Sequence, residues 1–398
     1  MYQIDQHNFK GKRVLVRVDF NVPLNDHYEV TDDTRIKAAI PTLEKLAKDG
    51  AKVIVMSHLG RPKSGPEHKF SLHHIIARLS SLTTCPVAFV EDCIGEKVSN
   101  AVDEMTEGSI LVLENLRFYK EEEKGDEFFA GQIAENGDVY VNDAFGTAHR
   151  AHASTAIIAN FFPTDKYFGY LMENEVKSID RVLNSTDKPV VAIVGGSKVS
   201  SKIGIIENLI NTADAIIIGG GMAFTFIKAM GGKVGSSLVE DDRLDQALLL
   251  MEKAKKQGVK FLLPTDAVIA NAFSNEAQTD IVDIDAIPEG WMGLDIAENS
   301  IAIFHETIVN AKIVLWNGPM GVFEMENFAK GTKAIAMALS EATQKGCFTL
   351  VGGGDSVAAI NQMNMADQVS YVSTGGGAML ESLEGIVLPG IAAILSKG

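Results

Sequence analysis

Short apolar runs recur along the whole chain and alternate with stretches whose apolar residues repeat at helical spacing. The runs are RVLVRV (13–18), KVIVM (52–56), SILVL (109–113), DVYV (138–141), VVAIV (190–194), AIII (215–218), KFLL (260–263), KIVLW (312–316) and FTLV (348–351). Near-continuous β-branched runs of this kind are typical of parallel strands buried on both faces. Their alternation with helices predicts an α/β fold with doubly wound parallel sheets.

The length of the chain predicts two domains, because 398 residues are too many for one ordinary hydrophobic core. Between the two series of runs, Met172, Val176, Ile179 and Leu183 share one face of a predicted helix. The expected parts are two Rossmann-like domains at 1–169 and 185–380, a hinge helix that joins them at 170–184, and a tail at 381–398 that returns to the first domain.

The positions that follow the strands of the first half are basic. Ligands of open parallel sheets bind beyond the carboxyl ends of the strands. Strand ends and one connection supply Asp19, Asn21, Arg35, His58, Arg61, Arg117, His149, Arg150 and His152. Any one of these residues alone would more often be a capping or surface group. Their recurrence at successive strand ends predicts a pocket for a small, multiply anionic molecule, since guanidinium groups match carboxylates and phosphates.

The strands of the second half are followed by glycine-rich segments instead. These segments are GGSK, GGGMAF, NGPMGVFE, GGGDS and STGGG. Glycine permits positive φ and close backbone approach, so that N–H groups can surround phosphates. The edge therefore predicts a nucleotide site, although neither GxxxxGK[ST] nor GxGxxG is present. The absence of GxGxxG disfavours a dehydrogenase.

Two lysines lie at the start of an expected helix and after the glycine pair at 195–196, in GGSKVSSKIGIIENLI. The apolar spacing predicts an amphipathic helix after Gly196, with Lys198 and Lys202 in its first turns. Cations are unfavourable at a helix amino terminus, and like charges four residues apart repel. Either both side chains point into water, or a polyanion lies at the helix start. These residues alone leave both interpretations open.

Two acidic residues of the second half are candidate ligands. Asp355, with Ser356, follows FTLVGGG where a helix should begin, so it could be a simple N-cap or could hold Mg²⁺. Glu324 could accept hydrogen bonds from a ribose or could be a solvated acid. Residue type does not decide between these roles.

Several longer motifs resemble those of the phosphoglycerate kinase family. In the first half they are DFNVP (19–23), TDDTRI (31–36), SHLGRP (57–62) and NDAFGTAHRAHAS (142–154). In the second half they are GGSKVSSKI (195–203), WNGPMGVFE (316–324), GGGDS (352–356), STGGGA (373–378) and LPGI (388–391). The resemblance spans nearly the whole chain. It implies Mg²⁺-dependent phosphoryl transfer between 1,3-bisphosphoglycerate and ADP, giving 3-phosphoglycerate and ATP.

The resemblance also implies roles for individual residues. The implied phosphoglycerate-binding residues are Asp19, Phe20, Asn21, Arg35, His58, Leu59, Gly60, Arg61, Arg117 and Arg150. The implied nucleotide-binding residues are Lys198, Lys202, Gly293, Asn317, Glu324, Gly353, Gly354, Asp355 and Ser356, with Asp355 on the metal. The groups expected to stabilise the moving phosphoryl group are Arg35, Lys198, Gly354 and Gly377.

Composition narrows the class of protein. The net charge of −16 argues against nonspecific binding to nucleic acid or to a membrane surface. No apolar run is long enough for a membrane span, and the first residues lack the apolar stretch of a signal peptide. Three cysteines without CxxC spacing indicate reduced thiols. We expect a cytoplasmic monomer, with a two-lobed binding protein as the alternative.

Overall fold

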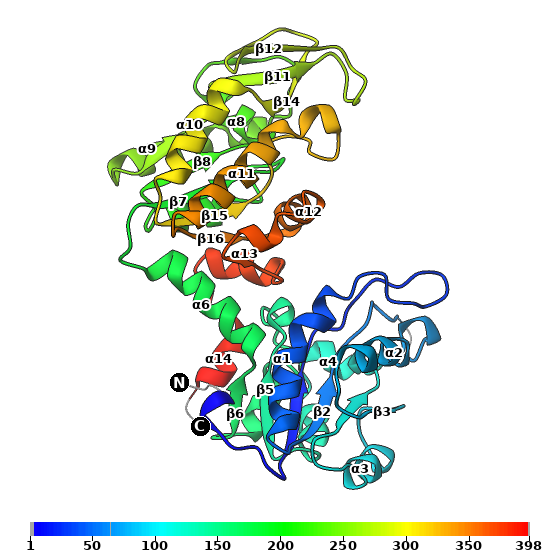
Figure 1. The fold of residues 1–398 in the computed structure, drawn as a ribbon. Helices are drawn as coiled ribbons and strands as arrows, with labels where there is room; N and C mark the ends of the chain where they lie inside the picture. The colour runs from blue at the N-terminus through cyan, green and yellow to red at the C-terminus, as the bar shows by residue number, and fades with distance from the viewer. Residues whose placement is uncertain (1–3, 64, 397–398) are drawn as a thin grey trace. The chain divides into compact units, whose positions relative to one another are not determined.

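The computed structural model describes residues 4–63 and 65–396, and the chain forms two compact units (Figure 1). The first unit runs to Lys177 and also takes in the segment from Val387 onward; the second is Ser178–Ile386. Helix α6 spans Tyr170–Asn184, the range expected for it, and one boundary lies inside it. Residues 381–386, expected in the tail, belong to the second unit.

The first unit is built on a parallel sheet with strand order β3-β4-β2-β1-β5-β6. Its strands are β1 (Arg13–Arg17), β2 (Lys52–Met56), β3 (Val87–Val90), β4 (Ile110–Leu113), β5 (Val139–Asn142) and β6 (Lys166–Phe168). The chain order reverses between β1 and β5, and ligands of such open sheets bind beyond the carboxyl ends of the strands at this point. The edge strands β3 and β6 were not among the predicted strands.

Helices cover both faces of this sheet. The helices of the first unit are α1 (Thr34–Lys48), α2 (His73–Leu82), α3 (Glu96–Asp103), α4 (Lys120–Lys124), α5 (Glu127–Ala134) and α14 (Pro389–Leu395). Val14, Val53 and Val141 pack on one face against Ile36 and Leu43 of α1. Alternate strand residues such as Leu15 and Ile54 are equally buried, as two-sided coverage requires. Short 3₁₀ helices lie at Ile4–Gln6, His68–Phe70, Leu116–Phe118, Phe145–Thr147 and Ile157–Phe161.

The second unit repeats the plan with strand order β10-β8-β7-β15-β16-β17, all parallel. These strands are β7 (Val190–Val194), β8 (Ala215–Ile218), β10 (Lys260–Leu262), β15 (Ile313–Asn317), β16 (Phe348–Val351) and β17 (Tyr371–Val372). The order reverses between β7 and β15, which places a crevice beyond their carboxyl ends. The prediction of two doubly wound parallel sheets is confirmed.

A smaller antiparallel sheet of the second unit was not predicted. It consists of β11 (Asp266–Ala270), β12 (Thr279–Asp283) and β14 (Met292–Ile296), and a short pair joins β9 (Lys233–Val234) to β13 (Ala286–Ile287). Four of the five residues of β12 are exposed, and β14 contains Gly293. Neither strand therefore shows the continuous apolar run that marks a strand buried on both faces.

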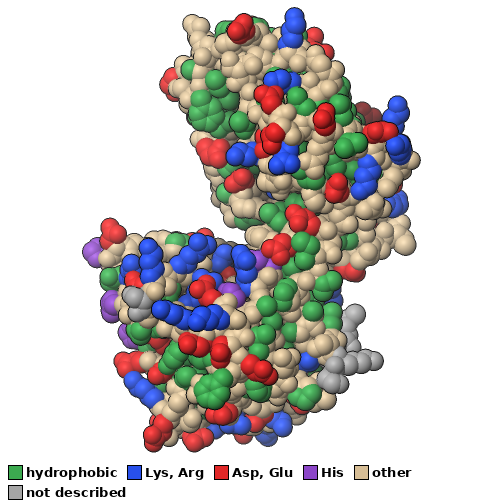
Figure 2. Space-filling view, turned by 180° about the vertical axis from the view of Figure 1, so that it is seen from behind, with side chains coloured by type: hydrophobic (Ala, Val, Ile, Leu, Met, Phe, Trp, Pro, Cys, Tyr) green, Lys and Arg blue, Asp and Glu red, His purple; other side chains and the backbone are tan. Residues whose placement is uncertain are grey.

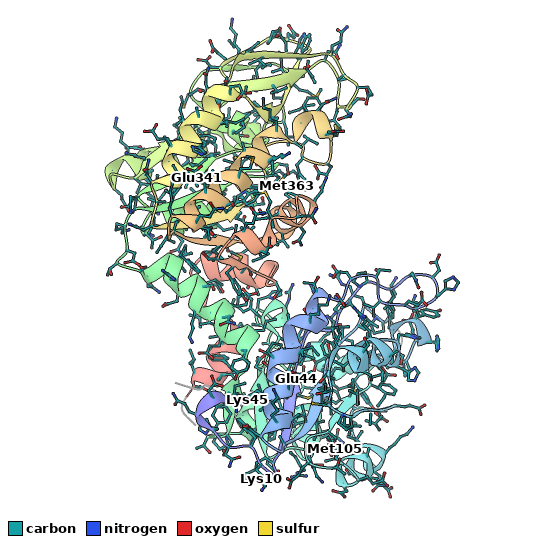
Figure 3. All side chains as sticks on the ribbon, in the orientation of Figure 1. Lys10, Glu44, Lys45, Met105, Glu341 and Met363 are labelled. Carbon is teal, nitrogen blue, oxygen red and sulfur yellow. The ribbon has the colours of Figure 1, made fainter. Side chains whose placement is uncertain are left out.

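The helices of the second unit are α7 (Ile203–Leu209), α8 (Met222–Ala229), α9 (Leu244–Lys256), α10 (Glu298–Val309), α11 (Lys330–Gln344), α12 (Gly354–Gln362) and α13 (Gly377–Leu383). Short 3₁₀ helices lie at Asp241–Arg243, Glu326–Phe328 and Ala366–Gln368. Helices α10 and α11 pack together, and His305 Nε2 lies 2.8 Å from Glu341 Oε2 of α11, labelled in Figure 3. Among the described residues, no helix is both long and apolar enough to cross a membrane.

Candidate active site

In the first unit, the segment after β1 holds an ion pair with the start of α1. Asp19 follows β1 and Arg35 lies in the first turn of α1. The Arg35 guanidinium donates to Asp19 Oδ2 at 2.7 Å, and the backbone N–H of Asn21 donates to Asp19 Oδ1 at 3.2 Å. The carboxylate offsets a cation that the helix amino terminus would otherwise disfavour. Asp19 thereby sets the direction of Arg35.

The same segment is tied to the loops after β2 and β4. The backbone N–H of Gly60 donates to Asn21 Oδ1 at 2.8 Å, and Arg117 donates to the Gly60 carbonyl at 3.0 Å. Asn115 donates to the Leu59 carbonyl at 2.7 Å. Three loops that are far apart in sequence are therefore joined at one edge of the sheet. The structure brings Asp19, Asn21, Arg35, Gly60 and Arg117 together.

Two histidines of this edge, His58 and His152, are held in the neutral form. Burial, reinforced by the positive charges of Arg17 and Arg117, holds the pKa of His58 well below its ordinary value. Burial and Arg117 likewise lower the pKa of His152 to about 4. The Arg17 guanidinium lies 3.3 Å from His58 Nδ1. At neutral pH these rings act as hydrogen-bond groups, so the positive charge of the site comes from arginine.

Other members of the predicted site differ in exposure. Arg61 and Arg150 are exposed, and Figure 2 shows Lys and Arg side chains gathered with His along one rim of this unit. The side chains of Phe20 and Leu59 belong to the hydrophobic core. They can therefore contribute only backbone groups to a ligand, and their place in the site stays a prediction.

In the second unit, a cavity of about 540 Å³ lies at the carboxyl edge of the sheet. Its polar lining includes the predicted residues Glu324 and Asp355, and Gly293 contributes from β14. Its apolar lining is made by Phe224, Leu238, Phe273, Met292, Leu294 and Val322. One side is therefore suited to an aromatic base, and the other carries backbone and carboxylate groups.

The glycine turns around this cavity pack directly on one another. A Cβ on Gly195 would lie 2.2 Å from the Pro319 carbonyl oxygen, and one on Gly220 would lie 2.6 Å from the Gly196 carbonyl oxygen. The N–H of Gly220 donates to the Met320 carbonyl at 3.0 Å. Glycine is required at these positions because the loops after β7, β8 and β15 are in direct contact. The predicted reason was a different one, the close approach of the backbone to phosphate.

Glycines at two helix starts are open to solvent instead. Gly354 begins α12, Gly377 begins α13, and both are exposed. A Cβ on Gly354 would meet no atom within 4 Å. The N–H groups of a helix start lack intrahelical partners and favour anions. The first turn of α12 is held to the loop after β15, because the Ser356 hydroxyl accepts a hydrogen bond from the N–H of Gly318 at 2.5 Å.

The predicted position of the two lysines was wrong. Helix α7 begins at Ile203, so Lys202 is its N-cap residue and Lys198 lies in a bend before it. Lys202 is half-buried and donates to Asn317 Oδ1. Burial lowers its pKa, whereas Asp355 and Glu384 raise it. Acids distant in sequence thus offset Lys202, and only Lys198 extends as an exposed cation.

The residues of this edge fit a magnesium–nucleotide complex. Asp355 is an exposed carboxylate in the first turn of α12 and lines the cavity. Within the described ranges, no cluster of three or more His, Cys, Asp or Glu could hold an ion unaided. Mg²⁺ bound with nucleotide needs only one or two protein carboxylates, since water and phosphate supply the rest. We therefore expect Asp355 to be the single protein carboxylate that binds Mg²⁺.

Comparison with known proteins shows the family of the chain. The family model described as phosphoglycerate kinase matches residues 4–386. The chain belongs to the phosphoglycerate kinase family. A chloroplastic phosphoglycerate kinase of Volvox carteri is 56% identical over 391 residues, 98% of this chain and 84% of that protein. A cytosolic one of Arabidopsis thaliana is 54% identical, covering 98% and 97%. The solved phosphoglycerate kinase of Coxiella burnetii is 40% identical with a TM-score of 0.90, covering 98% of each chain.

Membership of the phosphoglycerate kinase family makes the chain a phosphotransferase and explains two dissimilar edges in one molecule. The remaining predicted nucleotide residues lie around Asn317, which is fully buried. Asn317 accepts from Lys202 and donates to the Gly352 carbonyl at 2.7 Å, beside Gly353. Asn317 is therefore a group that arranges the loops, with its own amide turned inward.

The apolar wall of this cavity was missed by sequence reasoning. Phe273 follows β11, and Met292 and Leu294 lie on β14. These residues lie in or next to the antiparallel sheet, which was not predicted. Four of the five residues of β14 are buried, but Gly293 and Asp295 interrupt its apolar sequence.

Replacing Gly353 with alanine is expected to raise the KM for MgATP about tenfold, as a strained backbone costs roughly 1–3 kcal/mol. Gly353 has φ 92°, and a Cβ there would lie 2.4 Å from Asn317 Nδ2. The displaced Asn317 amide would lose its hydrogen bond from Lys202. Steady-state kinetics measure the change. Gly346→Ala is the matched control, because Gly346 has φ 88° but nothing within 4 Å of a Cβ. Equal KM values in the two variants would contradict the argument.

Stability is expected to depend on pH through Asp295. Burial raises the pKa of this carboxyl to about 7, while the N–H groups of Gly331 and Ile296 lower it. The folded chain therefore keeps a proton that the unfolded chain releases between about pH 4 and 7. This contribution to the free energy of unfolding is full below that window and is lost as pH rises through it.

The variant Asp295→Asn lacks this loss, so its stability relative to the wild type should improve as pH rises from 5 to 7. The slope is at most about 1.4 kcal/mol per pH unit for one group. Urea unfolding at the two pH values measures it. Asp280→Asn is the control, since Asp280 is exposed and accepts the same type of hydrogen bond from the next N–H at 2.8 Å. A difference that stays constant with pH would refute the prediction.

Proposed function

We propose that this chain is a phosphoglycerate kinase that transfers a phosphoryl group reversibly between 1,3-bisphosphoglycerate and ADP, giving 3-phosphoglycerate and ATP. The observation that carries the proposal is the presence of two chemically distinct edges on two doubly wound units of one family member. The first edge, around Asp19, Arg35 and Arg117, is suited to an anionic three-carbon acid. The second, with its apolar cavity and open helix starts, is suited to a nucleotide.

The chemistry needs no general base. In the direction that consumes ATP, the acceptor is the carboxylate of 3-phosphoglycerate, which is already ionised at neutral pH. One carboxylate oxygen forms a bond to the γ-phosphorus while the bond to the β,γ-bridging oxygen breaks, and the leaving oxygen stays on ADP. The neutral state of His58 and His152 agrees with this, because no proton must be removed.

Catalysis then consists of positioning and charge neutralisation. Arg35 would neutralise charge from the phosphoglycerate side and Lys198 from the nucleotide side. The free N–H groups at Gly354 and Gly377 would donate hydrogen bonds to oxygens of the phosphates. Mg²⁺, held by Asp355 and the nucleotide phosphates, would supply further positive charge when bound. Phe273 and Leu238 would exclude water from the base.

Direct transfer requires the two ligands to meet and water to be excluded. We place the necessary hinge in α6 and in the segment that returns to the first unit at Val387, because these carry the two unit boundaries. Substrate-driven closure of this kind protects a reactive phosphoryl group from hydrolysis. Scattering with 3-phosphoglycerate and MgADP together should show a smaller radius of gyration than with either alone, and an unchanged radius would contradict closure.

A turnover assay tests the proposal directly. The chain is mixed with 3-phosphoglycerate and MgATP, and ADP release is followed by a coupled reaction. Turnover that requires both substrates supports the kinase. Tight binding of 3-phosphoglycerate without turnover would favour the alternative of a two-lobed binding protein. We also propose that the protein acts as a cytoplasmic monomer without nucleic-acid or membrane partners, which its charge of −16 and a cytosolic relative support.

A further inference from the structure

Helix α6 begins without a cap of its own. The residue before its first position is Gly169, which has no side chain to accept the unpaired N–H groups of the first turn. Other elements supply the acceptors. The N–H of Tyr170 donates to the Thr42 hydroxyl of α1 at 2.9 Å, and the N–H of Met172 donates to Asp143 Oδ1 at 3.1 Å. The N–H of Leu171 hydrogen-bonds to the same carboxyl.

Asp143 is held at the carboxyl end of β5. It is buried, directly follows Asn142, the last residue of that strand, and its own N–H donates to the Arg17 carbonyl of β1 at 2.8 Å. A Cβ on Gly169 would lie 2.3 Å from Asp143 Oδ1, so the carboxyl reaches α6 only because glycine stands there. Thr42 lies on α1 one turn before Lys45, which Figure 3 labels. Strand β5, α1 and α6 are thus joined at one carboxyl.

The same short stretch also holds the segment that returns from the second unit. The Asn142 amide donates to the Gly390 carbonyl at 3.4 Å, and the N–H of Gly390 donates to the Ala148 carbonyl at 2.8 Å. Gly390 lies in α14, shortly after the chain re-enters the first unit at Val387. Residues 142–148 therefore contact the elements at which the chain leaves and re-enters this unit, and they open the loop that carries Arg150.

We propose that Asp143 is a positioning residue for the phosphoryl transfer: its carboxyl group fixes the first turn of α6 to the end of β5, so that the phosphoglycerate loop and the helix that leaves the first unit move as one piece. The inference rests on the proposed closure. It assigns to Asp143 no contact with substrate. It predicts that breaking this cap lowers the rate of productive closure while each ligand still binds.

The state of the carboxyl suggests a conservative substitution. Burial raises the pKa of Asp143 to about 7, while Thr42 and the N–H groups of Met172 and Leu171 lower it. The group is therefore protonated over part of the neutral range, and an amide of the same shape resembles it. Asp143→Asn keeps the oxygen that accepts from Met172, whereas Asp143→Ala removes it. The pair separates the loss of the cap from a change in charge.

The test compares both variants with the wild type in turnover and in scattering. Asp143→Ala is expected to lower kcat about tenfold, since losing a helix cap changes an equilibrium by a factor of that order. Its dissociation constants for 3-phosphoglycerate and MgATP, measured separately by calorimetry, should stay within twofold of wild type. The decrease in radius of gyration with 3-phosphoglycerate and MgADP should be smaller. Asp143→Asn should restore most of kcat and of the compaction.

Asp126→Ala is the matched control, because Asp126 caps α5 in the same unit by accepting from the N–H of Phe129 at 2.8 Å. An equal loss of kcat in this control would overturn the proposal by showing a general effect of cap loss. Wild-type kcat in Asp143→Ala would overturn it too. If that variant does not fold, Thr42→Val, which removes the acceptor of Tyr170, should lower kcat, and wild-type kcat there would refute the inference. Failure of the wild type to compact would instead refute closure itself.

Discussion

Replacing Lys198 with methionine is expected to lower kcat about 10²–10³-fold, the effect of removing one preorganised charge-stabilising group. Lys198 is exposed in the bend between β7 and α7, and its carbonyl accepts from the Ser201 hydroxyl at 2.9 Å. Ser200 is fixed in turn by Glu240, which accepts from its N–H at 2.9 Å. The backbone of the bend is therefore held while the ammonium group is free to meet an incoming phosphoryl group. Methionine keeps the length and removes the charge.

Coupled-assay kinetics with both substrates varied measure this effect. Because Lys198 is proposed to act on the moving group, kcat should fall more than the KM for MgATP rises. Lys256→Met is the control, since Lys256 is an exposed lysine of α9 whose side chain is 73% accessible. Turnover within threefold of wild type in Lys198→Met would remove Lys198 from the mechanism. Thermal unfolding should be unchanged in both variants.

Replacing Arg35 with methionine should lower kcat/KM for 3-phosphoglycerate about 10²–10³-fold. Two effects add here. The substrate loses a guanidinium group, and Asp19 loses its partner at 2.7 Å, so that an uncompensated carboxylate faces an anionic ligand. Arg35→Lys should give an intermediate value, because an ammonium keeps the charge but loses the planar fork.

Arg78→Met is the control for Arg35. Arg78 donates through Nε to Asp33 Oδ2 at 2.9 Å, so it also pairs with an acid at the start of α1, but it lies outside the predicted site. The MgATP dissociation constant should stay near wild type in every Arg35 variant. A rise in that constant, with 3-phosphoglycerate binding intact, would show that the two substrates were assigned to the wrong units.

The central strands of both main sheets were predictable because they are buried on both faces and so read as continuous apolar runs. β2, β7, β8 and β16 span the predicted residues. The exposed β12 and the glycine-containing β14 could not be found in this way, because half-buried or interrupted strands lack such a run. The bounds of α6 were also predictable, from the periodic spacing of Met172 and Ile179.

The chemical types of the two edges were predictable for a related reason. Side chains that follow parallel strands must lie at one edge, so Asp19, His58 and Arg117 could be grouped without knowing the strand order. Interactions that depend on the order of the strands in the sheet could not be predicted from the sequence. The contact between Lys202 and Asn317 spans 115 positions, and α7 begins only at Ile203, after both lysines.

Local residue pattern by itself determined the two doubly wound sheets, the connecting helix and the contrast between an arginine-rich and a glycine-rich edge, since burial on two faces and chemistry at strand ends are read from neighbouring residues. Only the tertiary structure decided which loops touch, which histidines stay neutral and which carboxyl holds α6. Those properties depend on strand order and on the depth of burial. Asp143 illustrates both, because it is buried and because its neighbours Gly169 and Thr42 are distant from it in the sequence.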